Sequence, residues 1–489
     1  MKFDLVQEGL YFKHKSQAID YWLFLGTLPS LLWNLNRLPE WSYEVFSSLG
    51  RGSFFIDGPI FSNLRYLVTC HPQNIEHILK TNFNNFPKGS DYKEVFGIFG
   101  DGIFNVDSDP WKVQRRMAHA GFTSGEFKTL VSNTSRQLVE EQLVPFLNHV
   151  AKNGSTIDLQ DVCSRFAFDS SLSVVFGRHE RYLSLGLPSN ELAEAADDAL
   201  EAILYRHAIP KFLWKLSSWL GVGRERKLSE AHKTIDLLFQ EYISQKRKDL
   251  HKGVESVDLL SSYIKSTIDH DLCKSDKFLR DAMLSLFLAG KDTITSGLIW
   301  FFWLVSKTPS VEMKILEELK ICLKKDEIEW PCVFDSDNLK GLVYLHAALC
   351  ESIRLYSPLP LNSKAVLKED VLPDGTLVEP GIQIIISLYS VGRMQWIWGE
   401  DCLEFKPERW IDDDGKLSHK PKLFAFNVGP RTCLGKDMSF TQMKVVVAAV
   451  LFNFHVEVVE DPHVCLKPTI NLHMKNGLKV NIKKRDIRC

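Results

Sequence analysis

The sequence predicts one mainly α-helical domain with small β-sheets. The stretch from about Lys277 to Ser306 has the apolar content of a buried helix and would be about 45 Å long, enough to cross a whole domain. Residues 124–272 carry apolar positions at helical spacing, interrupted by polar or Gly-containing breaks, which predicts successive amphipathic helices. The candidate strands, beginning with Ser53–Ile56 and Arg65–Cys70, are short, so the sheets should be small.

Length and composition favour one core over several. The chain has 489 residues, 45% of them hydrophobic, and contains no Pro/Gly/Ser-rich linker, low-complexity tract or internal repeat. Its formal charge of -2 argues against nucleic acid as a partner. Ten cysteines are scattered without paired metal-type spacings, which indicates free thiols in a reducing compartment. We therefore expect a single catalytic domain at 38–489, preceded by an atypical segment at 1–37.

The N-terminal segment does not have the pattern of a membrane-spanning helix. Met1–Ala18 is too polar, and the apolar run Tyr21–Leu35 is shorter than the roughly 20 residues that a bilayer needs and contains Pro29. Two interpretations stay open, contact with a membrane surface and packing against the domain, and we favour packing. The sequence predicts that an anchor is missing or replaced.

The most informative stretch surrounds Cys433. It lies in a loop just before the apolar segment Ser439–Phe452, so the amides and dipole at the start of a helix would stabilise its thiolate. Gly429 and Gly435 allow the close approach that a loop lying against a flat macrocycle requires. Arg431 is suited to a carboxylate. Cys433 is thus a candidate iron ligand, although a single cysteine in an apolar context is more often a buried structural thiol.

The spacing Phe426-x-x-Gly429-x-Arg431-x-Cys433-x-Gly435 resembles the haem-binding signature of the cytochrome P-450 (haem-thiolate monooxygenase) family at every fixed position. The resemblance spans about Leu38 to Lys484. It implies heme b with Cys433 as the axial thiolate, a ligand that favours O–O cleavage. It also implies cofactor contacts from Phe426, Arg431 and Gly435, and a haem held between the long helix and the Cys433 loop.

A finer likeness points to the plant fatty-acid ω-hydroxylase and midchain alkane hydroxylase clan. It rests on Phe86–Gly89, Gly100–Asn105, Arg206-His207 and Trp214–Leu216.

Before the cysteine loop, two helices carry residues with implied cofactor or structural roles. The first helix opens after Pro72 with Asn74 as its expected cap. A second begins at Asp109-Pro110-Trp111, where Pro suits the first turn. Trp111 and Arg115 are four residues apart and so lie on one helix face. The resemblance implies that this pair holds a haem propionate, whereas by spacing alone such a pair is frequent.

Residues 190–227 would by the same resemblance form a lid over the substrate channel. The segment contains Ile209-Pro210 and the apolar, Trp-bearing stretch Trp214–Leu220. Such a lid suits a lipophilic substrate or a membrane surface, and ordinary helix packing is the alternative.

The middle of the long helix resembles the family's oxygen-activation motif. Gly290 costs about 1 kcal/mol relative to Ala in a helix interior, so some function or packing must compensate. Thr293 can return its hydroxyl to the carbonyl of Ala289, which bends a helix and leaves a groove. The resemblance implies that the groove takes O2, that Asp292 delivers protons through water and that Thr293 holds the chain of hydrogen bonds. The alternative is a kinked core helix with a solvated Asp292.

A charged network is expected behind the site. Glu351 and Arg354 lie one turn apart on an apolar helix at Leu339–Leu355. The segment Phe405–Trp410 resembles the family segment that completes this network through Arg409. Buried charges must be paired, and we interpret the network as structural support.

The C-terminal third alternates strands and loops. Strands are expected at Lys364–Leu367, Val371–Val378 with a turn at Pro373–Gly375, Gln383–Leu388 and Phe454–Val459, with a hairpin turning at Asn476-Gly477. Lys364 is a further propionate candidate.

The expected substrate cavity contains few ionisable side chains. A largely apolar pocket favours a long aliphatic chain, because burial contributes about 0.8 kcal/mol per methylene. The favoured function is hydroxylation of a long-chain fatty acid or alkane. The alternative is oxidative phenol coupling or hydroxylation of an aromatic alkaloid on the Phe-rich loop. The same aromatic residues could also be ordinary core. The cavity candidates are Phe96, Phe99, Phe104, Leu288, Leu359, Leu361 and Ile470.

The resemblance also implies partners and a location. An enzyme of this kind takes electrons from NADPH through the NADPH–cytochrome P-450 reductase, and sits on the cytoplasmic face of the endoplasmic reticulum membrane. A haem-binding sensor or carrier without turnover is the alternative of another class, but it needs no proton delivery from Asp292 and Thr293. The basic residues expected to receive the reductase are Lys112, Arg116, Lys422, Lys436 and Lys444.

Overall fold

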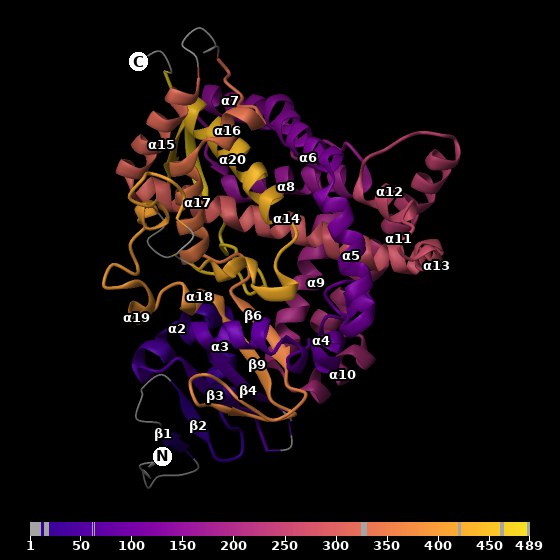
Figure 1. The fold of residues 1–489 in the computed structure, drawn as a ribbon, viewed down its shortest axis with the longest axis vertical. Coiled ribbons are helices and arrows are strands. Elements are labelled where there is room, and N and C mark those ends of the chain that lie inside the picture. Colours follow the sequence, from indigo (N-terminus) through magenta and orange to yellow (C-terminus); the bar gives the residue numbers. More distant parts are fainter. Residues whose placement is uncertain are drawn as a thin grey trace.

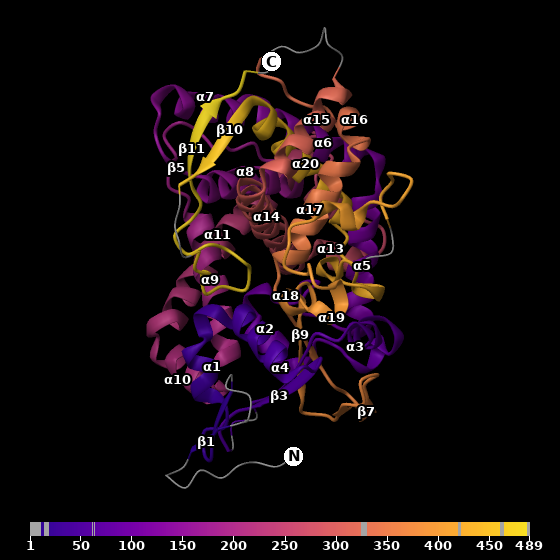
Figure 2. The same ribbon diagram turned by 90° about the vertical axis from the view of Figure 1, so that its left-hand side faces the viewer.

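The computed structural model describes residues 11–13, 19–60, 62, 64–323, 330–418, 422–459 and 464–486. Most of the polar stretch Met1–Ala18 therefore lies outside the described residues. The four-stranded sheet and the N-terminal elements occupy one end of the molecule, and most of the helices the other (Figures 1 and 2). The helices are α1 (Leu28–Trp33), α2 (Leu38–Leu49), α3 (Pro72–Glu76), α4 (Gly89–Val95), α5 (Ser108–Thr123), α6 (Gly125–Leu138), α7 (Val144–Asn153), α8 (Leu159–Phe176), α9 (Glu191–Ala208), α10 (Lys211–Leu220), α11 (Gly223–His251), α12 (Leu259–Ile264), α13 (His270–Lys274), α14 (Asp276–Lys307), α15 (Pro309–Cys322), α16 (Ser336–Lys340), α17 (Val343–Leu355), α18 (Leu388–Val391), α19 (Gln395–Trp398) and α20 (Lys436–Asn453).

The sheets are small, as predicted. The largest has the order β3-β4-β9-β6, in which β4 and β9 run parallel and the other neighbours antiparallel. β10, β11 and β5 form a second sheet, and β7 and β8 pair across the predicted turn at Pro373–Gly375. The strands are β1 (Tyr11–Lys13), β2 (Asp20–Trp22), β3 (Ser53–Asp57), β4 (Arg65–Thr69), β5 (Ile157–Asp158), β6 (Leu361–Ala365), β7 (Asp370–Val371), β8 (Leu377–Val378), β9 (Gln383–Ser387), β10 (Phe454–Val458) and β11 (Lys479–Lys484).

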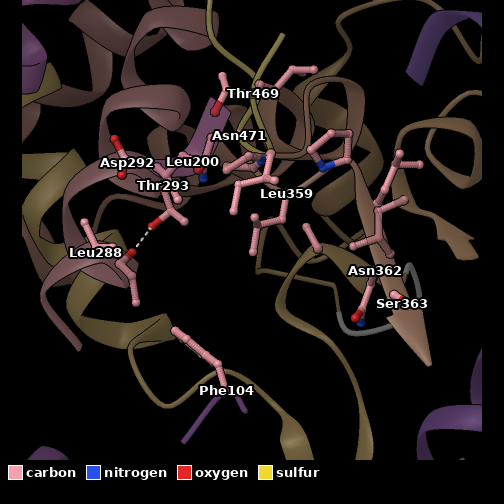
Figure 3. Close-up of a pocket in the computed structure, with 18 of the residues that line it drawn as sticks. Phe104, Leu200, Leu288, Asp292, Thr293, Leu359, Asn362, Ser363, Thr469 and Asn471 are labelled. Carbon is pink, nitrogen blue, oxygen red and sulfur yellow. Dashed lines mark hydrogen bonds between the residues drawn. The ribbon is translucent and has the colours of Figure 1, made fainter. Parts of the chain in front are cut away.

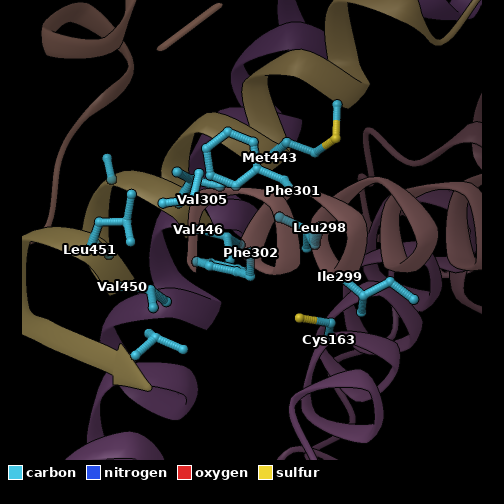
Figure 4. Packing of buried hydrophobic residues seen from close by; sticks show 14 of the residues in the cluster. Cys163, Leu298, Ile299, Phe301, Phe302, Val305, Met443, Val446, Val450 and Leu451 are labelled. Atoms are coloured by element: carbon cyan, nitrogen blue, oxygen red, sulfur yellow. The ribbon is translucent and has the colours of Figure 1, made fainter. Parts of the chain in front are cut away.

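The long helix α14 lies in the core, and the prediction of its ends is confirmed to within one residue. The Ser275 hydroxyl caps it by accepting the Phe278 N–H. Phe301 and Phe302 of α14 pack beside Met443 of α20 (Figure 4). Gly297 makes this approach possible, because a Cβ there would come within 2.7 Å of the Met443 sulfur. Both helices are apolar around most of their circumference, as buried helices are.

Two local predictions are wrong. Asn74 does not cap α3 but lies inside it, and its buried amide donates to the hydroxyls of Ser53 and Thr69, both at 3.2 Å. A long-range partner for the amide outweighs the local cap here. The hairpin at Asn476-Gly477 is also wrong, because β11 pairs with β10 and β5. Gly477 is needed instead because a side chain there would overlap the carboxylate of Asp158.

The N-terminal apolar run Tyr21–Leu35 has some side chains packed against the domain and others exposed to solvent. Leu31 and Leu35 are buried in the core beside the large sheet, which supports the packing interpretation. The same run leaves Trp33 89% exposed and Phe24 57% exposed. Among the described residues, no helix combines the length and apolarity needed to cross a bilayer.

Candidate functional site

One cavity of about 450 Å³ lies between the middle of α14, the Cys433 loop, the end of α9 and the large sheet. Its lining is predominantly apolar. Leu288 and Thr293 of α14, Leu359 and Phe104 approach it from different sides (Figure 3). The predicted site residues that line it are Phe96, Phe99, Phe104, Trp111, Arg115, Leu288, Ala289, Gly290, Asp292, Thr293, Leu359, Leu361, Phe426, Arg431, Cys433, Gly435 and Ile470.

The hydrogen bond predicted within α14 is present. The Thr293 hydroxyl donates to the carbonyl of Ala289 at 2.6 Å, shown as the dashed line in Figure 3. Gly290 is compensated by packing, because a Cβ there would lie 2.8 Å from the Ser171 hydroxyl of α8. The glycine therefore lets α8 approach α14 behind the groove.

Asp292 is buried, so the alternative of a solvated Asp292 is wrong. Its Oδ1 lies 3.1 Å from Nζ of Lys291, which is also buried. Lys291 Nζ further donates to Asp197 of α9 at 3.0 Å, and Lys467 pairs with the same carboxylate at 2.8 Å. Burial by itself lowers the pKa of Lys291, but the carboxylates of Asp292 and Asp197 outweigh it and raise the pKa above its usual value.

The cavity wall is attached to α14 at further points. Near its start, Asp281 accepts the Asp101 N–H at 2.9 Å and so fixes the loop that carries Phe99 and Phe104. Near its end, Ser296 and Trp300 donate to the carbonyl of Leu472 at 2.8 and 2.7 Å.

The cysteine loop is held tightly at its ends. The Cys433 N–H donates to the Phe426 carbonyl at 2.8 Å. Gly429 has φ 71°, and a Cβ there would overlap the backbone of Leu79. The thiol of Cys433 opens onto the cavity. Burial raises its pKa, while the amide of Gly435 and the charges of Arg115 and Lys436 oppose this and favour the thiolate.

Several cationic side chains lie near this loop, and not all of their N–H groups have a hydrogen-bond acceptor. Arg115 donates to the Thr432 carbonyl at 2.6 Å, and Arg431 donates to Asp107 at 2.8 Å with its guanidinium 4.6 Å from the Trp111 ring centre. Lys364 is buried and, unlike the other predicted cofactor residues, does not itself line the cavity, although its neighbour Ser363 does. Among the described residues, nothing accepts a bond from its Nζ or from Nε of Arg431. Burial lowers the pKa of Lys364 to about 7.

These residues fit a haem. Unsatisfied buried cations are costly and call for carboxylates. A thiol that opens onto an apolar cavity beside them suits the iron of a flat macrocycle that carries such carboxylates. Heme b has these groups.

The predicted charged network lies outside the cavity. Arg354 makes two bonds of 2.7 Å to the carboxylate of Glu351, which also receives Arg409 at 3.1 Å and the Trp410 indole at 2.9 Å. Arg354 also donates to the Cys402 carbonyl at 2.7 Å. The network thus joins α17 to the segment that leads into the cysteine loop, which agrees with a structural role.

A comparison with known families decides the identity. The family model described as cytochrome P450 matches residues 60–481. The chain belongs to the cytochrome P450 family. It is a monooxygenase that acts on lipophilic substrates, and family membership implies a haem-thiolate iron.

Three relatives of this P450 are informative. It is 43% identical to alkane hydroxylase MAH1 of Arabidopsis thaliana, over 95% of this chain and 93% of that protein. It is 40% identical to cytochrome P450 86B1 of Arabidopsis thaliana, over 97% of this chain and 87% of that protein. It is also 40% identical to a noroxomaritidine synthase of Narcissus aff. pseudonarcissus MK-2014, over 95% of this chain and 91% of that protein.

The basic residues expected to receive the reductase do not all face outward. Lys444 is buried, and its Nζ donates to the carbonyls of Leu339 and Leu342, so its assignment is wrong. α20 is enclosed on nearly all sides, and a lysine at its centre must find internal acceptors. Arg116 and Lys436 are exposed.

Three polar residues of the site were missed by sequence reasoning. Asp197 is one of several acidic residues in 191–201, and nothing in the sequence singles it out. Lys88 was visible within Phe86–Gly89 but received no role. His207 was visible as part of Arg206-His207 but received no role.

Proposed function

We propose that this P450 hydroxylates a long aliphatic chain, an alkane or a fatty acid. The observation that supports this best is the apolar cavity with the thiol of Cys433 and the groove at Thr293 in its walls. In the overall reaction, one atom of O2 enters a C–H bond and the other leaves as water, with two electrons from NADPH and two protons. The bound haem supplies the binding and reduction of O2.

The cysteine loop and α5 would hold the cofactor. Cys433 would bind the iron as thiolate, and Arg115, Arg431 and Lys364 would bind the propionates together with Trp111. Phe426 and Gly435 would complete the cofactor site. The unpaired Nζ of Lys364 supports this assignment.

Asp292 and Thr293 would deliver protons. The carboxylate of Asp292 relays protons through water, taking up one for each that it gives, while the Thr293 hydroxyl orients that water beside the Ala289 carbonyl. Lys291 fixes the carboxylate from the other side. A haem-binding carrier needs none of these groups, so their presence favours the enzyme.

The electron donor would be the NADPH–cytochrome P450 reductase. Its acidic surface would meet Arg116 and Lys436, which are exposed near the cysteine loop, together with Lys112 and Lys422. Lys112 and Lys422 already pair with Asp109 and Glu76, so they should contribute less. Turnover should weaken as salt rises.

The exposed apolar surface of α1 and α10 would rest on a lipid surface, on the cytoplasmic face of the endoplasmic reticulum membrane. The two helices lie at the same end of the molecule (Figure 2). Trp33 of α1 is 89% exposed, and Phe212 and Trp219 of α10 are 64% and 81% exposed. Leu31 of α1 also lines the cavity, so a lipophilic substrate could enter from the membrane.

Oxidation of an aromatic alkaloid, including phenol coupling, is the second candidate. It is favoured by the likeness to noroxomaritidine synthase and by the aromatic wall in which Tyr92 and Phe96 stack at 4.1 Å.

Titration of the haem spin-state shift tests the proposal. Affinity for alkanes and fatty acids should rise with chain length until the cavity is full. Product analysis with the reductase then identifies the carbon attacked. A tight shift with a phenolic amine and no chain-length dependence would overturn the aliphatic assignment. The Cys433→Ala variant should lose the thiolate-type carbon monoxide spectrum.

A further inference from the structure

His207 is a polar side chain in the apolar cavity. It lies in the last turn of α9 and lines the cavity beside Leu204 and Ala208. Its ring stands edge-on to Phe96, with 5.3 Å between the ring centres. Neither haem binding nor proton delivery, as described above, uses it.

The backbone of His207 is held in place by its neighbours. Arg206 makes bonds of 2.8 and 2.6 Å to the carboxylate of Glu225 and donates to the carbonyls of Glu94 and Val95. The Tyr66 hydroxyl donates to the carbonyl of His207 itself at 3.1 Å. The imidazole is therefore preorganised, and little conformational entropy of His207 is lost when a ligand binds to it.

The hydrogen-bond state of the ring follows from its partners. Nδ1 lies 2.9 Å from the Ile203 carbonyl, which can only accept, so Nδ1 carries the proton. Burial lowers the pKa of His207, and the charge of Lys88 lowers it further, while the bond to Ile203 raises it. Because the net shift is downward, the ring is neutral near pH 7. Nε2 is then a hydrogen-bond acceptor. No described residue donates to it.

Lys88, the cationic side chain whose charge acts on His207, is already engaged. Lys88 donates to Asn362 Oδ1 at 3.1 Å and to the Ser363 carbonyl at 3.4 Å, and its Nζ lies 4.0 Å from the ring centre of Tyr92. Among the described residues Nε2 thus has no donor, and His207 lines a cavity whose walls are predominantly apolar. Leaving such a group without a donor when a chain fills the space costs free energy.

We propose that Nε2 of His207 accepts a hydrogen bond from a hydroxyl group of the substrate, so that the preferred substrate of this P450 is a long-chain alcohol. The inference rests on the proposed function, hydroxylation of a long aliphatic chain, and puts an alcohol in place of the alkane or fatty acid as the preferred form of that chain. An alkane would bury Nε2 unsatisfied. Binding of an ionised carboxylate is disfavoured because both it and Nε2 can only accept hydrogen bonds, so their lone pairs would repel each other.

The test compares a straight-chain alkane with the primary alcohol and the carboxylic acid of the same carbon count, each titrated into the purified haem-loaded protein. The alcohol should bind about 3- to 10-fold more tightly than the alkane, as expected for one net hydrogen bond. His207→Leu should remove this preference, and alkane affinity should rise by about 3- to 10-fold because no Nε2 is then buried without a donor. His207→Gln keeps an acceptor and should restore part of the preference.

Phe96→Leu is the matched control in the same wall. It should weaken the alkane and the alcohol equally. The carbon monoxide spectrum checks that each variant holds haem as the wild type does. Should His207→Leu not fold, the wild-type alcohol-to-alkane ratio and His207→Gln decide the question.

Three outcomes are decisive against the inference. Equal affinity for alkane and alcohol in the wild type overturns it while leaving the proposed function intact. Tighter binding of the carboxylic acid overturns it in favour of an anion site at Lys88 and His207. If no aliphatic compound shifts the spectrum, the proposed function fails and the inference fails with it.

Discussion

Nζ of Lys291 lies 3.1 Å from Oδ1 of Asp292, the next residue in the chain, and both side chains are buried. Neighbours in a helix point about 100° apart, so this pairing requires the lysine to bend back toward the aspartate. Asp197 of α9 supplies the second carboxylate. The acid beside the groove therefore has its charge balanced within the protein.

Lys291→Met tests this balance. The change leaves Asp292 buried without a counter-charge, and the free energy of unfolding should fall by about 3 to 5 kcal/mol. Urea unfolding of the haem-loaded protein measures it. Lys467→Met is the control, since Lys467 pairs with the same Asp197 at a site one-third exposed and should cost about 1 kcal/mol or less. Equal losses in the two variants would contradict the assignment.

Thr293→Ala should still bind haem, but NADPH consumption should become uncoupled from product formation. Without the hydroxyl that orients water, product per NADPH should fall by about tenfold or more while hydrogen peroxide rises. Thr293→Ser retains an Oγ that can reach the Ala289 carbonyl and should stay close to the wild type. Unchanged coupling in Thr293→Ala would remove the residue from the mechanism.

Haem uptake should depend on pH through Lys364. In the haem-free protein, burial lowers the pKa of Lys364 to about 7, so the side chain is charged below pH 7 and neutral above it. A propionate partner would keep it charged to higher pH, so binding takes up a proton above pH 7. Haem affinity should therefore be constant below pH 7 and fall as pH rises beyond it, by at most tenfold per pH unit.

Quenching of tryptophan fluorescence during haem titration measures this dependence. Lys364→Met should bind haem more weakly and without the decline above pH 7. The exposed Lys368, four residues on, is the control, and Lys368→Met should behave as the wild type. A wild-type affinity that is flat across pH 7 would refute the role of Lys364.

Gly100→Ala should destabilise the loop that carries the cavity aromatics. Gly100 has φ 52°, and a Cβ there would overlap the carboxylate of Asp281. The melting temperature should fall by about 1 to 3 °C, equivalent to a loss of about 1 to 3 kcal/mol. Gly186→Ala, where no atom lies within 4 Å of the new Cβ, should change it little. If both variants melt alike, the Asp281 contact does not constrain the loop.

The sequence was most informative where its signals were local. The ends of α14 follow from a long apolar run, and the turn between β7 and β8 follows from Pro373–Gly375. The cysteine loop follows from a fixed spacing that resembles a known signature.

Long-range contacts could not be predicted in the same way. Nothing near Lys291 shows that its second partner is Asp197, because that contact depends on how α9 crosses α14. The error at Lys444 has the same origin, since a lysine on a helix looks exposed until α17 and its neighbours enclose it. His207 drew attention only through likeness, because the free acceptor on its ring depends on Ile203 and on the shape of the cavity.

The attachments along α14 bear on how this enzyme could be re-engineered. Side chains of α14 bond three stretches of the cavity wall that are far apart in the sequence. Asp281 holds 96–105, Lys291 holds α9, and Ser296 and Trp300 hold 466–474. Each stretch is hydrogen-bonded to α14 at a different position along the helix. Segments from related enzymes could therefore be exchanged singly, as cassettes, provided that each brings the group that its own bond to α14 needs.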